Sequence, residues 1–293
     1  MPTKAKPAYF YGVKKYYLCF LLLVMVLPVT AQELHVMSFN IRYDNPGDSL
    51  NAWPYRKDKV TSQILFHDTH LLGVQEALYS QLQDMQLQLK RFKYAGKGRK
   101  DGMKAGEFSA IFYDTTRLHL LKSETFWLAE QTDVAGKKGW DAAFERVVTW
   151  ASFRDKKTKK VFFHFNTHFD HMGKVARKES AELLLSKISE IAGSAQVIVT
   201  GDFNAQPNDE PIQVLTDSSN SKRLTDTRLV SKKPHYGPMG TFNAFGPKEI
   251  HDQPIDYIFI KNGIRVLKHA TLSQSWQGRF SSDHFPVYAE VVL

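Results

Sequence analysis

The sequence predicts an α/β protein in which two β-sheets pack face to face and helices cover the outside. Two observations support this fold class. Ten strand-like stretches stand beside only four helix-like ones, which is too many strands for a single doubly wound sheet. In addition, two neighbouring pairs of strand-like stretches resemble hairpins, 109–113 with 118–127 and 147–154 with 160–167.

Residues 1–31 have the pattern of a secretory signal. Four lysines and no acid precede an apolar run at 16–27, and small residues end at Ala31, which places cleavage before Gln32. The alternative is an uncleaved membrane anchor, although about 12 apolar residues are few for a span of roughly 20. We therefore expect export to the periplasm or the outside of the cell.

The remaining stretch, 32–293, has the length of one domain with a sizeable core. Without the four signal lysines it has 35 basic and 30 acidic residues, a net charge of +5. This mild charge is compatible with a phosphate-bearing substrate and does not require nucleic acid. The only cysteine, Cys19, lies in the signal, so the mature chain has no disulfide, thiolate zinc site or iron–sulfur cluster.

The elements follow from hydrophobic periodicity. The expected strands are Leu34–Arg42, Leu71–Gln75, Ser109–Tyr113, Leu118–Trp127, Val147–Arg154, Lys160–Thr167, Gln196–Thr200, Pro254–Ile260, Ile264–Ser273 and Phe285–Val292. The expected helices are Tyr55–Phe66, Ser80–Leu89, Lys174–Ile191 and Glu210–Leu215. Gly193 ends the third of these helices. The segment 129–146 shows no such pattern, and its aromatic residues indicate an ordered loop beside a site.

Polar side chains gather where the strands end or begin. They are Asn40, Glu76, Asn166, His168, Asp170, Asp202, Asn204, Asp256, Asp283 and His284. Any one of them alone is typical of a turn or a helix cap. Six strand ends of this kind in one chain indicate a shared pocket. Its carboxylates, amides and imidazoles suit Mg²⁺ or Mn²⁺ and the oxygens of a phosphoryl group.

These motifs resemble those of the endonuclease/exonuclease/phosphatase superfamily, which includes deoxyribonucleases, inositol polyphosphate 5-phosphatases, bacterial sphingomyelinases and deadenylases. The similar segments, in the family's order, are 37–42, 73–76, 166–171, 201–205 (Gly-Asp-Phe-Asn-Ala), 255–258 and 282–287 (Ser-Asp-His-Phe-Pro-Val). The resemblance implies a four-layer α/β sandwich with two mostly antiparallel sheets. It also implies a hydrolase that uses a divalent metal, Mg²⁺ or Mn²⁺, to cleave a phosphate ester.

The resemblance further implies a role for each matching residue. Glu76 is the principal metal ligand, with Asn40 beside it and Asp283 completing the metal or water shell. Asp202 handles a proton, and Asn204 holds a phosphate oxygen. Asp256 orients His284, and His168 donates to the phosphate or the leaving group.

Weaker matches assign three more residues. Glu107 pairs with His168, or is only a surface acid at a strand start. Arg146 clamps the scissile phosphate together with Asn166, or is only a solvated arginine. The expected reaction is inline attack of water on phosphorus, without a covalent enzyme intermediate.

The substrate stays open at this stage. Phe144 and Trp140 of the 129–146 loop, with Trp276, suit one wall of a compact pocket, so a small or lipid-derived phosphoester is favoured. A secreted nuclease is the alternative, with basic clusters such as 97–104 and 156–160 as its nucleic-acid surface. A non-catalytic binding module on the same scaffold is a third reading. Without an evident interaction helix, we expect a monomer.

Overall fold

The computed structural model describes residues 1–9, 32–246 and 252–293. Contacts divide the chain into two compact units, Met1–Ala31 and Gln32–Leu293. The predicted signal's apolar run lies outside the described residues, and cleavage before Gln32 stays a prediction. Within the described ranges, no helix combines the length and the apolar character needed to cross a membrane.

The second unit contains two six-stranded sheets within its described residues. The first has the order β11 (Arg265–Thr271), β14 (Val287–Val292), β1 (Leu34–Asn40), β2 (Leu71–Ala77), β4 (Phe108–Asp114) and β3 (Phe92–Ala95). The second has the order β5 (Leu118–Trp127), β6 (Val147–Asp155), β7 (Val161–His168), β8 (Gln196–Asp202), β10 (Asp256–Lys261) and β9 (Thr225–Asp226). The pairs β1–β2 and β7–β8 are parallel, and the other pairs are antiparallel. A short ribbon joins β12 (Ser275–Trp276) to β13 (Arg279–Phe280).

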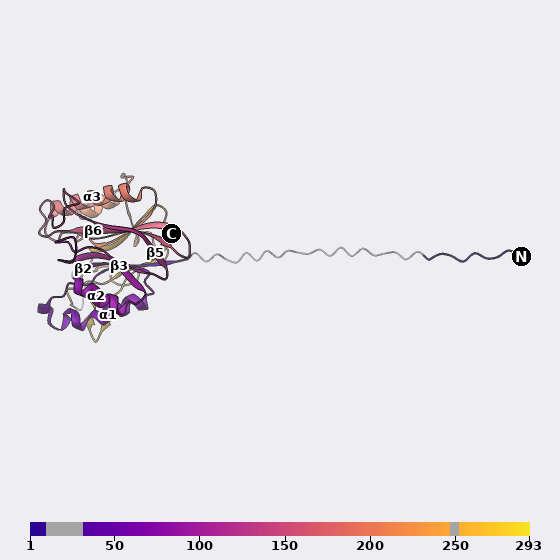
Figure 1. Cartoon of the computed structure of the whole chain (residues 1–293), viewed down its shortest axis with the longest axis horizontal. Coiled ribbons are helices and arrows are strands. Elements are labelled where there is room, and N and C mark those ends of the chain that lie inside the picture. The colour runs from indigo at the N-terminus through magenta and orange to yellow at the C-terminus, as the bar shows by residue number, and fades with distance from the viewer. Residues whose placement is uncertain (10–31, 247–251) are drawn as a thin grey trace. The chain divides into compact units, whose positions relative to one another are not determined.

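Helices cover the outer face of each sheet. The helices α1 (Lys57–Phe66) and α2 (Tyr79–Gln88) pack on the first sheet, preceded by the 3-10 helices Pro46–Asn51 and Trp53–Tyr55. The helices α3 (Lys174–Ala192) and α4 (Glu210–Thr216) pack on the second sheet. Figure 1 shows the resulting four layers, with α3 on one side of the sandwich and α1 and α2 on the other. The predicted four-layer sandwich is confirmed.

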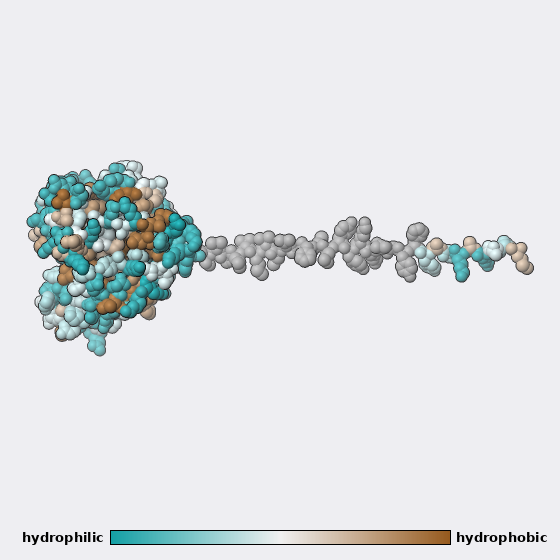
Figure 2. All heavy atoms as spheres, in the orientation of Figure 1, coloured by the Kyte–Doolittle hydropathy of each residue, from teal (hydrophilic) through white to brown (hydrophobic). Residues whose placement is uncertain are grey.

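The core follows from strand alternation. On β8, Val197 and Val199 pack against the helices of their own sheet, whereas Ile198 faces the other sheet. Both faces of the central strands are therefore apolar, as expected for strands buried on two sides. In the view of Figure 2, hydrophobic residues on the surface form separate groups within a mainly hydrophilic face.

The predicted elements all occur, with ends that shift by a few residues, while the short strands β3, β9, β12 and β13 were not predicted. The hairpin of 147–154 with 160–167 is confirmed as β6–β7. The hairpin of 109–113 with 118–127 is wrong, because β4 and β5 belong to different sheets. The turn between them carries the chain across the sandwich. Arg117 anchors this crossing through two hydrogen bonds to Asp155 of β6.

Candidate active site

A cleft of about 540 Å³ opens where β2, β7 and β8 end. Strand geometry aims side chains into it. In β2 the pairing with β4 is irregular between Val74 and Ala77, and Glu76 in this bulge has a φ of 61°. Asn204, with a φ of 47°, also lines the cleft. A left-handed conformation costs a non-glycine residue about 1–3 kcal/mol and is common at functional sites.

The structure brings most of the predicted site residues together. Eight of them line the cleft: Glu76, Glu107, Arg146, His168, Asp202, Asn204, Asp283 and His284. Asn40 and Asp256 lie behind this wall and hydrogen-bond to residues in it. Asn166 is the one predicted site residue that neither lines the cleft nor lies directly behind its wall. The other residues come from both sheets and from distant parts of the sequence, and the cleft brings them together.

A buried histidine lies between two buried aspartates. His284 Nδ1 is 2.8 Å from Asp256 Oδ2, and His284 Nε2 is 3.8 Å from Asp202 Oδ2. Burial alone would lower the pKa of His284, but the charges of Asp256 and Asp202 outweigh it and raise that pKa well above its ordinary value. Burial, reinforced by Asp256, raises the pKa of Asp202 to about 7. At neutral pH, His284 therefore holds a proton that it can share, and Asp202 exchanges one.

Asp256 is itself held in place. Its Oδ2 accepts a hydrogen bond of 2.6 Å from Thr241 Oγ1. The Thr241 hydroxyl also accepts from the backbone N–H groups of Ile255 and Asp256. Thr241 thus fixes the carboxylate that fixes the tautomer of His284.

Asn40 connects two carboxylates at the end of β1. Its Oδ1 accepts from the backbone N–H of Arg42 at 3.0 Å, which sets the orientation of the amide. Its Nδ2 then lies 3.0 Å from Glu76 Oε1 and 2.9 Å from Asp202 Oδ2. In this orientation Asn40 is a donor that positions Glu76, and it does not present an oxygen to a metal beside Glu76.

The donors around Glu76 fit a hard divalent cation. Glu76 and Asp283 both line the cleft, and Arg42 lies 3.9 Å from the first and 3.7 Å from the second. Burial raises the pKa of Asp283, and the negative charge of Glu76 adds to this effect. Two neighbouring carboxylates of this kind are stabilised by a cation, and oxygen donors suit Mg²⁺.

A second acidic group also offers ligand atoms. Asp202, Asp256 and His284 each provide one atom, all within 4.8 Å of one another. However, the Nδ1 atom of His284 is already engaged by Asp256. This group therefore suits proton transfer, whereas the carboxylates of Glu76 and Asp283 suit a metal.

Arg146 forms a wall of the cleft with one N–H group unused. Its Nε donates to Asp170 Oδ2 at 3.3 Å, and its Nη2 lies 3.2 Å from His171 Nδ1. Its Nη1 is buried and has no hydrogen-bond partner in the part of the chain that the structure describes. Phe144 stacks on His171 beside it, with 5.8 Å between ring centroids and 15° between planes. This wall offers a positive, unsatisfied donor and a flat aromatic surface.

His168 and Asn204 form a second polar wall. Asn204 Nδ2 donates to the Phe169 carbonyl at 3.0 Å and lies 3.0 Å from His168 Nε2. Because the amide nitrogen donates, His168 Nε2 accepts and the ring proton lies on Nδ1. Burial, with the positive charges of Arg146 and Arg99, lowers the pKa of His168 well below its ordinary value. Of the three histidines that line the cleft, His168 thus favours the neutral form and His284 the protonated form.

The predicted pairing of Glu107 with His168 is wrong. Both Glu107 oxygens bind Arg99, at 2.7 and 2.8 Å, and His168 Nδ1 has no hydrogen-bond partner among the described residues. Arg99 lies in the loop before β4, so the competing cation comes from a segment with no regular pattern. Burial raises the pKa of Glu107, and the Arg99 charge opposes this effect.

Asn166 does not line the cleft. It is fully buried between the sheets, where its Nδ2 donates to the carbonyls of Val74 and Ala110. Its Oδ1 accepts from Gln75 Nε2 at 2.7 Å and from Thr200 Oγ1 at 2.9 Å. Three of these four hydrogen bonds join its strand to the other sheet, and the one from Thr200 comes from the neighbouring strand β8. The predicted phosphate contact is therefore replaced by a structural role, because Asn166 lies inside the strand and not at its end.

Other residues of the site were missed or misplaced by sequence reasoning. Arg99 and Lys100 line the cleft, although their basic cluster indicated only a nucleic-acid surface. Thr241 carried no signal, because it lies in a loop without periodicity. Trp276, predicted in the cleft wall, instead lines a separate cavity with Phe66.

Comparisons with known proteins agree with this geometry. The sequence model of the endonuclease/exonuclease/phosphatase family matches residues 37–284. A crystal structure of a family member from Bacteroides vulgatus is 39% identical, with a TM-score of 0.84, over 89% of this chain and 99% of that one. A mannosyl-6-phosphatase from Bacteroides thetaiotaomicron is 36% identical, with a TM-score of 0.83, over 89% of this chain and 100% of that one.

A more distant relative is Protein angel of Drosophila melanogaster, 25% identical over 64% of this chain. The match spans only about half of that protein, 53% of its length.

The chain belongs to the endonuclease/exonuclease/phosphatase family. It is a hydrolase that acts on phosphoester bonds.

Proposed function

We propose that the protein is an exported, Mg²⁺-dependent phosphatase that removes the terminal phosphate from a sugar phosphate. Sugar phosphates are one class among the small phosphoesters that the sequence favours as substrates. A nuclease is the alternative function.

The observation that carries this proposal is the unused Nη1 of Arg146. A buried guanidinium N–H without a partner is costly unless a ligand completes it. Arg146 is only 5% exposed, and its other nitrogens are committed to Asp170 and His171. A phosphoryl oxygen is one of the charged acceptors that a guanidinium binds strongly.

The cleft also suits a small substrate. Its volume of about 540 Å³ lies within the usual range of small-ligand pockets. The stacked rings of Phe144 and His171 offer a flat face on which a sugar ring can pack. The similar mannosyl-6-phosphatase supports a hexose 6-phosphate as the first substrate to test.

The residues divide the reaction between them. Glu76 and Asp283 would hold the divalent cation, which neutralises charge on the phosphoryl oxygens when bound. Arg146 binds one phosphoryl oxygen, and protonated His284 donates to another. Asp202 accepts one proton of the attacking water as the oxygen of that water bonds to phosphorus, the bond from phosphorus to the sugar oxygen breaks, and the sugar oxygen takes a proton from solvent water. Asp256 keeps His284 oriented throughout.

The test is a substrate panel with purified residues 32–293. It compares mannose 6-phosphate, other hexose phosphates, bis-p-nitrophenyl phosphate, single-stranded RNA and plasmid DNA, each with Mg²⁺ and with a chelator. We expect Mg²⁺-dependent release of inorganic phosphate from a hexose phosphate. Cleavage of RNA or plasmid without phosphate release would establish the nuclease. Folded protein without activity on any substrate would favour a binding module.

A further inference from the structure

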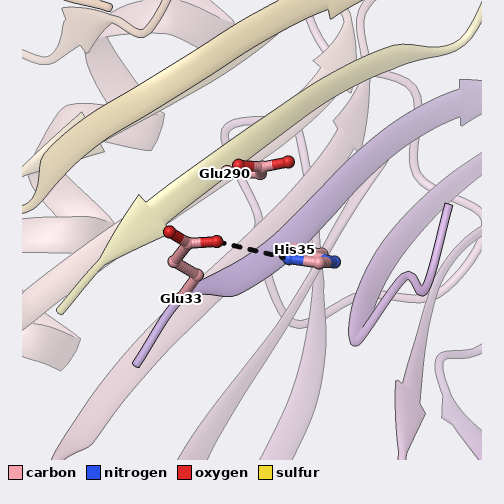
Figure 3. A group of neighbouring side chains, drawn as sticks. All are labelled: Glu33, His35 and Glu290. Atoms are coloured by element: carbon pink, nitrogen blue, oxygen red, sulfur yellow. Dashed lines mark ion pairs between the residues drawn. The ribbon is translucent and has the colours of Figure 1, made fainter. Parts of the chain in front are cut away.

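Three potential ligands for a metal meet away from the cleft. Glu33, His35 and Glu290 each offer one ligand atom, and these atoms lie within 4.8 Å of one another. Figure 3 shows the carboxylate of Glu33 facing the ring of His35, with Glu290 beside them. None of the three lines the active cleft.

Strand pairing places these residues together. His35 of β1 and Glu290 of β14 are directly opposite partners in the antiparallel ladder. Glu33 precedes His35 by two positions, so its side chain falls on the same face. His35 lies near the start of β1, and Asn40 of the active site lies at its end, about 17 Å away at the usual rise per residue.

The tautomer of His35 leaves its other nitrogen free for a cation. Its Nδ1 lies 3.1 Å from the carbonyl oxygen of Asp68, which can only accept, so Nδ1 carries the ring proton. Nε2 then presents a lone pair, and it lies 4.0 Å from Glu33 Oε2. Histidines that bind metals usually have their second nitrogen held by an acceptor in this way.

Glu290 supplies a buried carboxylate. Its side chain is only 9% exposed, its Oε1 accepts from Lys268 Nζ and from the Tyr288 hydroxyl, and its Oε2 has no partner among the described residues besides its ion pair with Lys268. Its present counter-ion is Lys268 of β11, whose Nζ lies 2.9 Å away and whose side chain is 56% exposed. Because Lys268 is largely in solvent, it can turn outward when another cation replaces it.

We propose that Glu33, His35 and Glu290 form a second metal site, which binds Zn²⁺ in competition with Lys268. One imidazole and two carboxylates match the ligands of Zn²⁺, with water in the fourth position, whereas Ca²⁺ takes only oxygen ligands. The bound ion would fasten the segment before β1 to β14. The role is structural and is independent of the proposed phosphatase activity.

The test is a Zn²⁺ titration of residues 32–293 labelled with ¹⁵N-histidine, followed by NMR of the imidazole nitrogens. The His35→Asn variant identifies the His35 signals. We expect the His35 Nε2 signal to shift and to saturate at one equivalent. His35→Asn should retain the activity of the wild type, because His35 is remote from the cleft.

Two substitutions and one control test the ligand set. Glu33→Gln should weaken Zn²⁺ binding at His35 at least about tenfold, and it leaves the fold intact because Glu33 is exposed and precedes β1. Glu124→Gln, an exposed glutamate on β5, should change nothing. Lys268→Met should tighten binding by up to about fivefold, the equivalent of a strong surface ion pair.

The outcomes are decisive in both directions. A His35 Nε2 signal that does not move while other histidines respond to Zn²⁺ would overturn the site. Equal affinities in Glu33→Gln and Glu124→Gln, or no tightening in Lys268→Met, would do the same. If the protein proved inactive on every substrate of the panel, the Zn²⁺ titration would still be valid, because it measures only the NMR signal of His35.

Discussion

Two buried arginine–aspartate pairs in this protein look alike but are completed differently. Arg117 donates to both oxygens of Asp155, through Nε at 3.0 Å and Nη2 at 2.8 Å. Arg146 donates to Asp170 only through Nε, at 3.3 Å, and its buried Nη1 has no partner among the described residues. The guanidinium groups are similarly buried, with side-chain exposures of 4% and 5%.

The difference separates structure from function. The Arg117–Asp155 pair lies within the second sheet, where it ties the turn before β5 to the end of β6, and Asp155 also accepts from the backbone N–H groups of Lys157 and Thr158. The Arg146–Asp170 pair lies at the cleft and leaves Nη1 of the arginine without a partner among the described residues. Burial alone therefore does not distinguish a structural arginine from one that is available to a ligand.

The largest expected effect comes from the cleft's protonated imidazole. His284→Ala removes the donor that Asp256 orients, and we expect kcat to fall about 10²- to 10⁴-fold. Steady-state phosphate release measures this. His119→Ala, an exposed histidine on β5, is the matched control and should leave kcat unchanged. Equal losses in both variants would point to general damage and not to catalysis.

Lysine substitutions at Arg146 and Arg117 test whether the two arginines have different roles. Arg146→Lys keeps the charge but loses the planar donor fork, so we expect kcat/KM to fall about 10²-fold with little change in melting temperature. Arg117→Lys should lower the melting temperature and leave kcat/KM per folded molecule near that of the wild type. A reversed pattern would mean that the two pairs have been assigned the wrong roles.

Removal of Arg117 tests its structural role more severely than the lysine substitution does. Arg117→Ala leaves Asp155 as an unpaired buried charge, and we expect the free energy of unfolding to fall by about 3–5 kcal/mol. Urea denaturation followed by fluorescence measures this. Arg154→Ala, an exposed neighbour on β6, should change it by less than about 0.5 kcal/mol.

The protonation state of Asp202 should appear in the pH profile. Asp202 accepts a proton from water only when it is ionised, and its pKa is raised to about 7. We therefore expect kcat/KM to fall about tenfold per pH unit below 7 and to level off above 7. The charges of Asp256 and Asp202 raise the pKa of His284 well above its ordinary value, so the protonated ring is favoured there. In Asp202→Asn most of the activity should be lost, and the remaining kcat/KM should no longer fall as the pH drops below 7.

The smallest expected effect is that of Thr241. Thr241→Val removes the hydroxyl that fixes Asp256, at a cost of about 1 kcal/mol, so kcat should fall roughly fivefold. KM should change little, because Thr241 lies behind the cleft. A kcat equal to that of the wild type would show that Asp256 needs no such support.

The sequence predicted the fold well because strands and helices leave local periodic patterns. It also identified cleft residues such as Glu76 and His284, because they end or precede apolar strands within recognisable motifs. It did not predict which sheet β5 joins, since pairing between strands is not encoded in the period of either one. Nor did it predict the Arg99–Glu107 pair, because loop residues such as Arg99 follow no period that sets their direction.

The central claim, that Arg146 presents its unused donor to a phosphate, is tested most directly by product inhibition. Inorganic phosphate should inhibit the wild-type enzyme competitively, and Arg146→Lys should raise its inhibition constant by at least about tenfold. Arg117→Lys should leave that constant unchanged. The same inhibition constant in wild type and Arg146→Lys would contradict the claim.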